Sequence, residues 1–441
     1  MTDGTKEPQG LAMPATRIAR IGRLGGLAGG IVGRMLVGGM RQLASGQRPQ
    51  LQDLLLTPAN ALIITQQLAQ MRGAAMKVGQ LMSMDAGGFL PPELSNVLSR
   101  LRANAEPMPP QQLRTVLDAD WGKGWIGRFA DFNVRPFASA SIGQVHRART
   151  KDGRDLAIKV QYPGVRASID SDVTNVAALV RLSGLIPKTL DLAPLLAEAR
   201  RQLQEEADYD REAAQMTRCA ELLRGAPQFQ VPGLHGDFSG RNVLAMDFLE
   251  SQPIEVLEAA PQAERDRVVQ SLIRLALDEL FTFNLMQTDP NFANYRFNPK
   301  TGQIVLLDFG ATRSFAAEIA PLFRALLHAG LAGDRGLIRQ AAIEIGYFDA
   351  TTKPAHQEAV LGMIDLAMTP FRSPGVFDFN GNDLVQRLRD QGLALGRDRG
   401  FCHIPPMDVL LVHRKIGGLY LLASRLKARI DLHALLGEYA Q

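Results

Sequence analysis

Runs of apolar residues predict strands in the middle of the chain. Residues 137–146 and 156–160 have the apolar pattern of strands and flank a turn at 151–153. The runs at 243–249 and 304–307 are short and apolar, as buried strands are. The pattern therefore predicts two paired strands followed, later in the chain, by two further buried ones.

Helical periodicity occupies most of the remaining chain. Residues 57–106 place four apolar side chains on one helical face, namely Leu62, Ile63, Leu68 and Met71. Further helical stretches are predicted at 192–224, 263–283 and 314–441. Proline and glycine at 373–375 and proline at 405–406 should break the last stretch, because neither residue type continues a helix well.

The composition indicates a folded chain with a large core. The chain has 441 residues, of which 46% are hydrophobic, and this is enough for two lobes or domains. Its two cysteines, Cys219 and Cys402, lie far apart and form no Cys-x-x-Cys pair. We therefore expect neither a disulfide framework nor a zinc site, and a reducing compartment.

The net charge of +4 is concentrated near the N-terminus. Residues 8–52 contain six Arg and no Asp or Glu, which leaves −2 for the rest of the chain. Arg20, Arg34 and Arg41 are whole heptads apart, so a helix would carry them on one stripe suited to an anionic lipid surface. The basic character of the protein therefore belongs to this arm.

The glycines of the arm leave a second interpretation open. They recur at four-residue spacing between residues 22 and 33, which would let another helix approach closely. So many glycines also weaken a helix, so a flexible arm remains an alternative. The apolar run is too short to span a bilayer, and a secretory signal is not expected. Nucleic acid is not expected either, because no aromatic residues interleave with the Arg residues.

Three polar residues at kinase-like spacing indicate phosphoryl-transfer chemistry. Asp289 is followed five residues later by Asn294, and Asp308-Phe309-Gly310 begins fourteen residues after that. In kinase-like folds such an Asp orients the nucleophile, while the Asn and the Asp of Asp-Phe-Gly hold metal that bridges the phosphates. Either motif alone is an ordinary turn. Together they predict ATP with Mg²⁺, a catalytic Asp289, and Asn294 and Asp308 as metal ligands.

A small-residue loop and a lysine indicate where phosphate would bind. The loop residues are Ala138, Ser139, Ala140 and Ser141, and Lys159 follows on the next predicted strand. This order is typical of the hairpin that covers nucleotide in kinases and of the lysine that pairs with its phosphates. The usual three glycines are absent. Because Ala and Ser restrict the backbone, we expect the loop to grip phosphate differently.

The apolar run at 243–249 predicts the adenine side of the same site. It ends in Met246, Asp247, Phe248 and Leu249, where a strand would lead into a hinge. The backbone of these four residues could hydrogen-bond adenine.

Acidic residues at 205–212 offer partners for two lysines. Lys159 needs a carboxylate, for which Glu212 is the candidate, and Glu206 and Asp208 remain for another cation. Lys77 lies three residues before Gln80, so the two share a helical face in a small-residue segment. Lys-x-x-Gln pairs and acidic helix faces are, however, usually just solvated.

Taken together, the motifs resemble those of the UbiB family of atypical kinase-like proteins, in particular the branch associated with coenzyme Q in mitochondria and related bacteria. The segments that carry the resemblance are 77–80, 138–146, 157–165, 206–209, 286–291, 307–313, 413–418 and 426–429. They extend over about residues 16–440, and their joint occurrence is highly specific.

The resemblance implies an α+β, bilobal, atypical protein-kinase-like fold with four regions. These are a basic, Gly-rich arm at 1–50 in contact with a membrane, a helical extension at 51–127, an N-lobe at 128–249, and a C-lobe with extra C-terminal helices at 250–441. The extension carries Lys77 and Gln80 and would cover the site that otherwise receives a peptide. In the family its lysine pairs with the Glu-x-Asp acids, which assigns Lys77 to Glu206 and Asp208.

The resemblance also implies a function, an ATPase that uses ATP/ADP and Mg²⁺ to support ubiquinone biosynthesis. Its place would be the cytoplasmic side of a bacterial inner membrane, with mitochondria as the alternative. Its partners would be membrane lipid or quinone intermediates and ubiquinone-biosynthesis enzymes, and a homodimer is left open. Two other functions stay possible: a small-molecule or lipid kinase of the same fold, and a nucleotide-regulated lipid-binding scaffold without catalysis.

Departures from ordinary kinases bear on regulation and substrate. Gln287 and Thr288 stand where kinases have His-Arg, so control by a phosphorylated activation loop is not expected. No Ala-Pro-Glu follows Asp308, so the peptide platform of protein kinases is not expected. Ser139 stands where the branch usually has a third alanine, which should slightly change how the loop seats phosphate.

Overall fold

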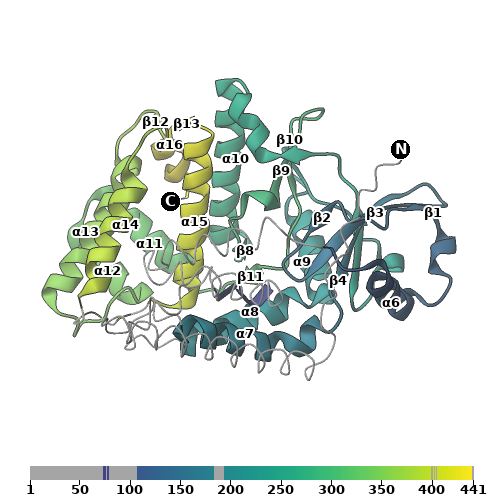
Figure 1. The fold of residues 1–441 in the computed structure, drawn as a ribbon. Coiled ribbons are helices and arrows are strands. Elements are labelled where there is room, and N and C mark those ends of the chain that lie inside the picture. The colour runs from purple at the N-terminus through teal and green to yellow at the C-terminus, as the bar shows by residue number, and fades with distance from the viewer. Residues whose placement is uncertain are drawn as a thin grey trace, which may run out of the picture. The chain divides into compact units, whose positions relative to one another are not determined.

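The computed structural model describes residues 73–75, 77–78, 107–182, 193–398, 401, 403 and 405–439. The predictions for the basic arm, for the helical face at 62–71, for Gln80 and for Cys402 fall outside these residues. Of the described residues, those before 214 and those at 233–248 form one compact unit, and those at 214–232 and from 249 onward form a second (Figure 1).

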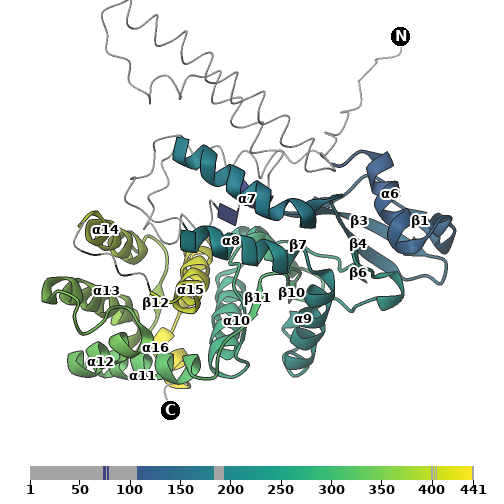
Figure 2. The same cartoon turned by 90° about the horizontal axis from the view of Figure 1, so that it is seen from below.

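The first unit is built on an antiparallel sheet with the strand order β1-β3-β4-β6, and β2 pairs with β3. The strands are β1 (Phe129–Phe132), β2 (Ala138–Ser139), β3 (Gly143–Thr150), β4 (Asp155–Gln161) and β6 (Val243–Asp247). The helices are α6 (Pro110–Trp121), η1 (Trp125–Arg128), α7 (Val165–Leu182), α8 (Ala193–Glu206), η2 (Gly236–Phe238) and α9 (Tyr209–Leu222), which continues into the second unit. Helices α7 and α8 lie side by side (Figure 2).

The core of the first unit lies between α6 and the sheet. Leu113, Val116 and Leu117 form the buried face of α6 and pack with apolar side chains of β4 and β6. Pro110 begins α6 and Gly122 follows its last residue with φ of 80°, a left-handed conformation that glycine adopts without strain. This packing fixes the strand that carries Lys159.

Two predicted elements are divided in the structure. Residues 137–146 are not one strand, because the chain turns back after β2 and the Ala140 N–H donates to the Gly143 carbonyl at 2.9 Å. Residues 192–224 are two helices, α8 and α9, with a break at 207–208. The break places Glu206 at the end of one helix and Asp208 directly before the next.

The second unit combines small sheets with a helical bundle. Its sheets are β5-β10-β9-β7, β8-β11 and β12-β13. The strands are β5 (Phe229–Gln230), β7 (Gln252–Pro253), β8 (Leu285–Gln287), β9 (Tyr295–Asn298), β10 (Gln303–Leu306), β11 (Thr312–Ser314), β12 (Phe377–Asp378) and β13 (Arg429–Ile430). The helices are η3 (Ile254–Ala259), α10 (Gln262–Phe281), η4 (Phe292–Asn294), α11 (Ile319–Ala332), α12 (Arg335–Ile345), α13 (Pro354–Arg372), α14 (Leu384–Arg397), α15 (Met407–Arg425) and α16 (Leu432–Gly437).

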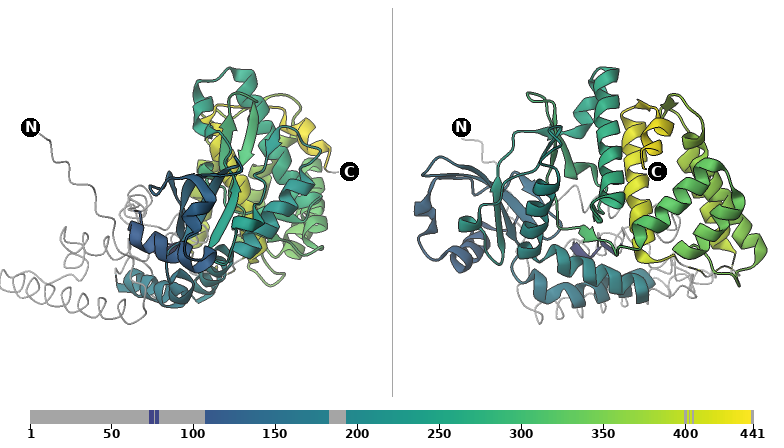
Figure 3. Two further views of the ribbon diagram at one scale, coloured as in Figure 1. Left: turned by 90° about the vertical axis from the view of Figure 1, so that its right-hand side faces the viewer. Right: turned by 180° about the vertical axis from the view of Figure 1, so that it is seen from behind.

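Local signals explain where several helices of this unit begin and end. The Asp334 carboxylate accepts from the backbone of Gly336 and Leu337 and caps α12, and Gly346 ends that helix with φ of 90°. Helix α15 begins directly after Pro406, as the proline pair predicted. It runs alongside α10 in both Figure 1 and Figure 3. Within the described part of the chain, no helix is long and apolar enough to cross a membrane.

Candidate active site

In the first unit, Lys159 forms a buried ion pair with Glu212. Strand β4 pairs Lys159 with Val145 on one side and Leu244 on the other, so the lysine lies in the middle of the sheet. Its ammonium donates to both carboxylate oxygens of Glu212, at 2.7 and 2.8 Å. Glu212 belongs to the first turn of α9, and this is the partner that the sequence analysis proposed.

The small-residue loop makes a tight hairpin against β4. Ala138 and Ser139 are exposed in β2, and the chain returns at Gly143. A Cβ atom on Gly143 would lie 2.4 Å from the Val160 carbonyl oxygen, so only glycine allows this approach. The Ser141 hydroxyl donates to Glu206 at 2.9 Å, which ties the loop to the end of α8.

Lys77 and Glu206 form an ion pair, and Lys77 is buried. The helical turn before Lys77 packs on the small-residue loop, because a Cβ atom on Gly73 would lie 3.2 Å from the Ser141 carbonyl oxygen. Asp208, which was expected to be a second partner of Lys77, has other contacts. It caps α9 by accepting from the Arg211 N–H at 3.2 Å, and its carboxylate lies 3.6 Å from the Arg166 guanidinium.

Two backbone N–H groups of the predicted hinge, those of Asp247 and Phe248, already form hydrogen bonds within the protein. The Phe248 N–H donates to the Asp155 carbonyl at 2.9 Å and the Asp247 N–H donates to the Gly233 carbonyl at 3.0 Å. The Asp247 carboxylate contacts the His235 ring at 2.7 Å. An adenine ring would therefore have to use other backbone groups of the segment from Met246 to Leu249.

In the second unit, Asp289 lies just after β8. Strand β8 pairs with β11, and both the N–H and the hydroxyl of Thr288 donate to the Ala311 carbonyl, at 3.2 and 2.8 Å. The loop after Asp289 ends in η4, whose last residue is Asn294. The loop is thus held to the segment that follows Asp-Phe-Gly.

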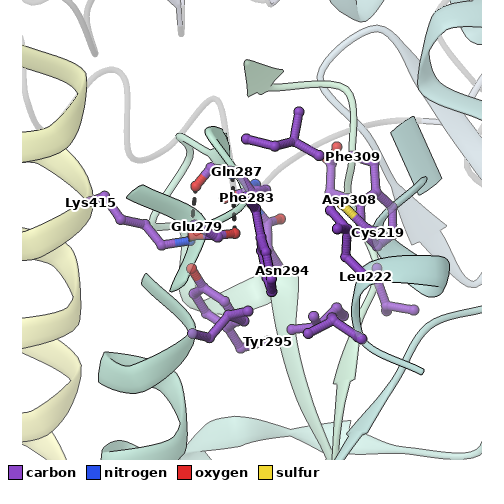
Figure 4. A pocket seen from close by; sticks show the side chains of 15 residues that line it. Cys219, Leu222, Glu279, Phe283, Gln287, Asn294, Tyr295, Asp308, Phe309 and Lys415 are labelled. Carbon is purple, nitrogen blue, oxygen red and sulfur yellow. Dashed lines mark hydrogen bonds and ion pairs between the residues drawn. The ribbon is translucent and has the colours of Figure 1, made fainter. Parts of the chain in front are cut away.

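The β9-β10 hairpin brings Asn294 beside Asp308. Tyr295 pairs with Leu306 in this hairpin, and the Leu307 N–H donates to the Asn294 carbonyl at 3.3 Å. Both side chains line one pocket (Figure 4). Cys219 also lines it, but burial raises the pKa of this thiol to about 12, so it stays protonated at neutral pH and is no nucleophile.

The side-chain oxygens of Asn294 and Asp308 are suitable ligands for magnesium. The Asn294 amide nitrogen donates to Asp289, at 3.2 Å to Oδ2 and 3.0 Å to the carbonyl, so its oxygen faces away from Asp289. Asp308 accepts from the Gly310 N–H at 3.0 Å through one carboxylate oxygen. Magnesium prefers oxygen ligands and is commonly held by one or two protein groups, with water and phosphate completing its shell. Among the described residues no cluster of three or more His, Cys, Asp or Glu offers an all-protein cage.

Four residues that hold the loop around Asp289 were not found by sequence reasoning: Glu279, Arg414, Lys415 and Gly418. Arg414 Nη2 lies 2.6 Å from Asp289 Oδ1. Lys415 lies 2.8 Å from Glu279 and donates to the Gln287 carbonyl at 2.9 Å. The segment 413–418 was recognised only as part of the resemblance, and no local signal joins it to residues more than a hundred positions earlier.

The Glu279–Lys415 pair is buried beside the pocket. In Figure 4, Lys415 and Glu279 lie on one side of Asn294, and Asp308 and Phe309 lie on the other. Burial by itself would lower the pKa of Lys415, but the adjacent Glu279 carboxylate and Tyr295 hold it above its ordinary value. Lys415 is therefore charged at neutral pH, and its charge is matched by Glu279.

Comparison with known proteins shows which family the chain belongs to. Residues 100–342 match the ABC1 atypical kinase-like domain. The chain is 36% identical over 433 residues to the mitochondrial atypical kinase COQ8 of Saccharomyces cerevisiae, covering 97% of this chain and 85% of that protein. It is 36% identical over 426 residues to the mitochondrial atypical kinase COQ8B of Rattus norvegicus, covering 95% and 79%. The solved structure of Rv3197 of Mycobacterium tuberculosis with erythromycin is similar at a TM-score of 0.60 and 25% identity, covering 87% of this chain and 97% of that chain.

The fold and the site define a protein-kinase-like α+β protein of the atypical class. The chain belongs to the ABC1 atypical kinase-like family, which the sequence analysis identified as the UbiB family, and it is an atypical kinase/ATPase enzyme. The predicted family, fold class and enzyme class are confirmed.

Proposed function

We propose that the chain binds ATP with magnesium and hydrolyses it, in support of ubiquinone biosynthesis at a membrane. One observation carries the proposal. Asn294 and Asp308, fourteen residues apart, are brought to one pocket by a hairpin, with Asp289 hydrogen-bonded to Asn294. Oxygen donors placed in this way suit a metal-bound triphosphate better than any structural role that the described contacts suggest.

Each named residue has one task in this proposal. Asn294 and Asp308 would hold the metal, and Asp289 would orient the attacking water. Lys159, held in place by Glu212, would pair with phosphate, and the loop from Ala138 to Ser141 would cover it. Bound magnesium supplies neutralisation of the charge on the phosphates. The chain contributes mainly position and electrostatics.

Lys77 would close the site to peptides. Its ion pair with Glu206, which also accepts from Ser141, joins the N-terminal extension to the small-residue loop. A protein substrate would have to displace a buried lysine from its carboxylate, which is costly. We therefore propose ATP hydrolysis over protein phosphorylation, and we retain the four proposed regions, with the arm at 1–50 as the membrane contact.

The cellular role rests on the relatives. The relatives named above are called mitochondrial atypical kinases of the COQ8 type. We propose that this chain works at a mitochondrial or bacterial membrane, with lipid or quinone intermediates and quinone-biosynthesis enzymes as its partners.

The test is magnesium-dependent nucleotide binding and turnover by the purified chain, with γ-labelled ATP. We expect label in inorganic phosphate, and loss of turnover by about 100-fold or more in Asp308→Asn, because one metal ligand loses its charge. Asp334→Asn is the matched control, since Asp334 caps α12 and Asn caps nearly as well. Equal turnover in Asp308→Asn and in the unmodified chain would contradict the proposal.

A cellular measurement separates catalysis from scaffolding. In cells that depend on this chain for quinone, Asp289→Asn should lower quinone content if hydrolysis is needed. Unchanged quinone content with Asp289→Asn, together with loss on deletion of residues 1–50, would favour the lipid-binding scaffold. Label found in a small molecule or lipid would favour the kinase alternative.

A further inference from the structure

A cation that contacts the predicted catalytic loop comes from a distant helix. Residues 287–294 contain no Lys or Arg. Arg414 of α15 supplies the positive charge instead, since its Nη2 lies 2.6 Å from Asp289 Oδ1. Both side chains are largely buried, with exposed fractions of 10% and 17%. An ion pair shielded from water in this way holds its geometry better than one on the surface.

Helix α15 is fixed against the loop on both sides of Asp289. The next residue, Lys415, donates to the Gln287 carbonyl at 2.9 Å and is anchored by Glu279. One turn later, Gly418 packs on Pro290, because a Cβ atom there would lie 2.2 Å from the Pro290 Cβ atom. Arg414 therefore reaches Asp289 from a rigid base, with contacts to the residues just before and just after it.

Asn294 is oriented by the Asp289 carboxylate together with the Asp289 carbonyl, which also accepts from the Asn294 amide nitrogen, at 3.0 Å. An ionised carboxylate only accepts hydrogen bonds, and Arg414 takes Oδ1 of Asp289. The other oxygen, Oδ2, accepts from the Asn294 amide nitrogen at 3.2 Å. The amide oxygen of Asn294 must then face the opposite way, and no described residue donates to it. Asn294 and Asp308 line the same pocket, where a metal would need such an oxygen.

We propose that Arg414 is a positioning residue for the metal ligand Asn294 and acts on it through Asp289. The proposal rests on the magnesium site of the proposed function and adds a residue to it. Residues that orient a metal ligand from behind typically change metal affinity by about 10- to 100-fold when they are replaced. A purely structural ion pair would change stability and leave metal affinity alone.

The experiment is a titration of Mn²⁺ and of Mg²⁺ into the full chain with saturating ADP. Binding is measured by calorimetry and, for Mn²⁺, by electron paramagnetic resonance. We expect Arg414→Gln to weaken metal binding by about 10- to 100-fold while metal-free ADP binding stays within about twofold. The metal affinity of Arg414→Lys should lie between those of the unmodified chain and Arg414→Gln, because a lysine keeps the charge but lacks the planar guanidinium group. Arg274→Gln is the matched control, since Arg274 pairs with Glu438 at the surface.

A double mutant tests whether Arg414 acts through Asp289. In an Asp289→Asn background, Arg414→Gln should cause little further loss of metal affinity, because the charged carboxylate through which Arg414 acts is already gone. Fully additive losses would overturn the proposal, as would wild-type metal affinity in Arg414→Gln. If Arg414→Gln does not fold, wild-type metal affinity in Arg414→Lys overturns it.

The outcomes separate this inference from the proposed function. Absence of any metal-dependent ADP binding by the unmodified chain would defeat both. Normal binding by the unmodified chain and by Arg414→Gln would defeat only the role of Arg414.

Discussion

Each of the two units contains a buried Lys–Glu pair beside a tyrosine, and the two pairs differ in surroundings. In the first unit the exposed fractions of Lys159 and Glu212 are 11% and 1%, and the ammonium lies 5.3 Å from the Tyr209 ring centre. In the second unit those of Lys415 and Glu279 are 1% and 9%, and the ammonium lies 5.6 Å from the Tyr295 ring centre. The chemical groups are the same.

The difference lies in what else the pair holds. Lys415 also donates to the Gln287 carbonyl, and Glu279 accepts from the Gln287 N–H at 3.2 Å, so this pair grips the backbone two residues before Asp289. Lys159 donates to both carboxylate oxygens of Glu212 from the middle of the sheet, between Val145 and Leu244. We infer that the second pair anchors the loop that carries Asp289, whereas the first pair lies on the β4 strand that the proposed function assigns to phosphate binding. A buried Lys–Glu pair therefore does not by itself identify a nucleotide site.

Breaking the anchor should have the largest effect. Lys415→Met leaves Glu279 buried without its partner, and we expect a loss of about 3–5 kcal/mol in the free energy of unfolding. Urea denaturation at neutral pH measures it. The double variant Lys415→Met with Glu279→Leu should recover most of the loss, because no unpaired charge remains. A loss below about 1 kcal/mol in the single variant would show that the pair is no anchor.

Removing both charges of the first pair should separate activity from stability. Lys159→Met with Glu212→Leu should change the free energy of unfolding by less than about 2 kcal/mol, since neither charge is left unpaired. ATP turnover should fall by about 100-fold or more, because the phosphates lose a fixed positive charge. The matched double variant of the second pair should lose turnover by no more than about tenfold. Equal losses in the two double variants would remove the distinction.

The pH dependence of the free energy of unfolding tests the burial of His413, which lies two residues before Lys415 in α15. Burial lowers the pKa of His413, the neighbour of Arg414, to about 4, and its Nε2 lies 2.5 Å from the Tyr347 hydroxyl. Between pH 6.5 and about 4 the unfolded chain binds a proton at this residue and the folded chain does not, so stability should fall as the pH falls through that range. We expect His413 to account for about 2 kcal/mol of lost stability between pH 7.5 and 5. His413→Phe should lose that share of the pH dependence in urea denaturation, and an unchanged dependence would contradict the assignment.

A surface pair should show the smallest effect. Arg274 and Glu438 approach to 2.5 Å but are both partly exposed, so water screens their attraction. Arg274→Gln should change the free energy of unfolding by less than about 1 kcal/mol and leave ATP turnover unchanged. A larger change in either measurement would mean that short distance, and not burial, governs these pairs.

Residue types and their spacing were enough to predict several strands, the helix breaks and the candidate site residues of this protein. Turn residues and apolar periodicity located the strand that carries Lys159, the strand that precedes Asp308, and the breaks at 373–375 and before Met407. The chemistry of an acceptor-only carboxylate and a metal-binding amide identified Asp289, Asn294 and Asp308 as candidates. Such predictions can be made from sequence because these signals are local or belong to well-defined motifs.

Tertiary structure decided which groups meet across long stretches of chain. Arg414 reaches Asp289 over 125 residues, and Lys415 reaches Gln287 over 128. The break at 207–208, which leaves Glu206 for Lys77 and Asp208 for Arg166, also lay within a stretch that looked continuously helical. A charged side chain has many possible partners in an unfolded chain. Only the packing of α15 on α10 and on the loop after β8 selects one.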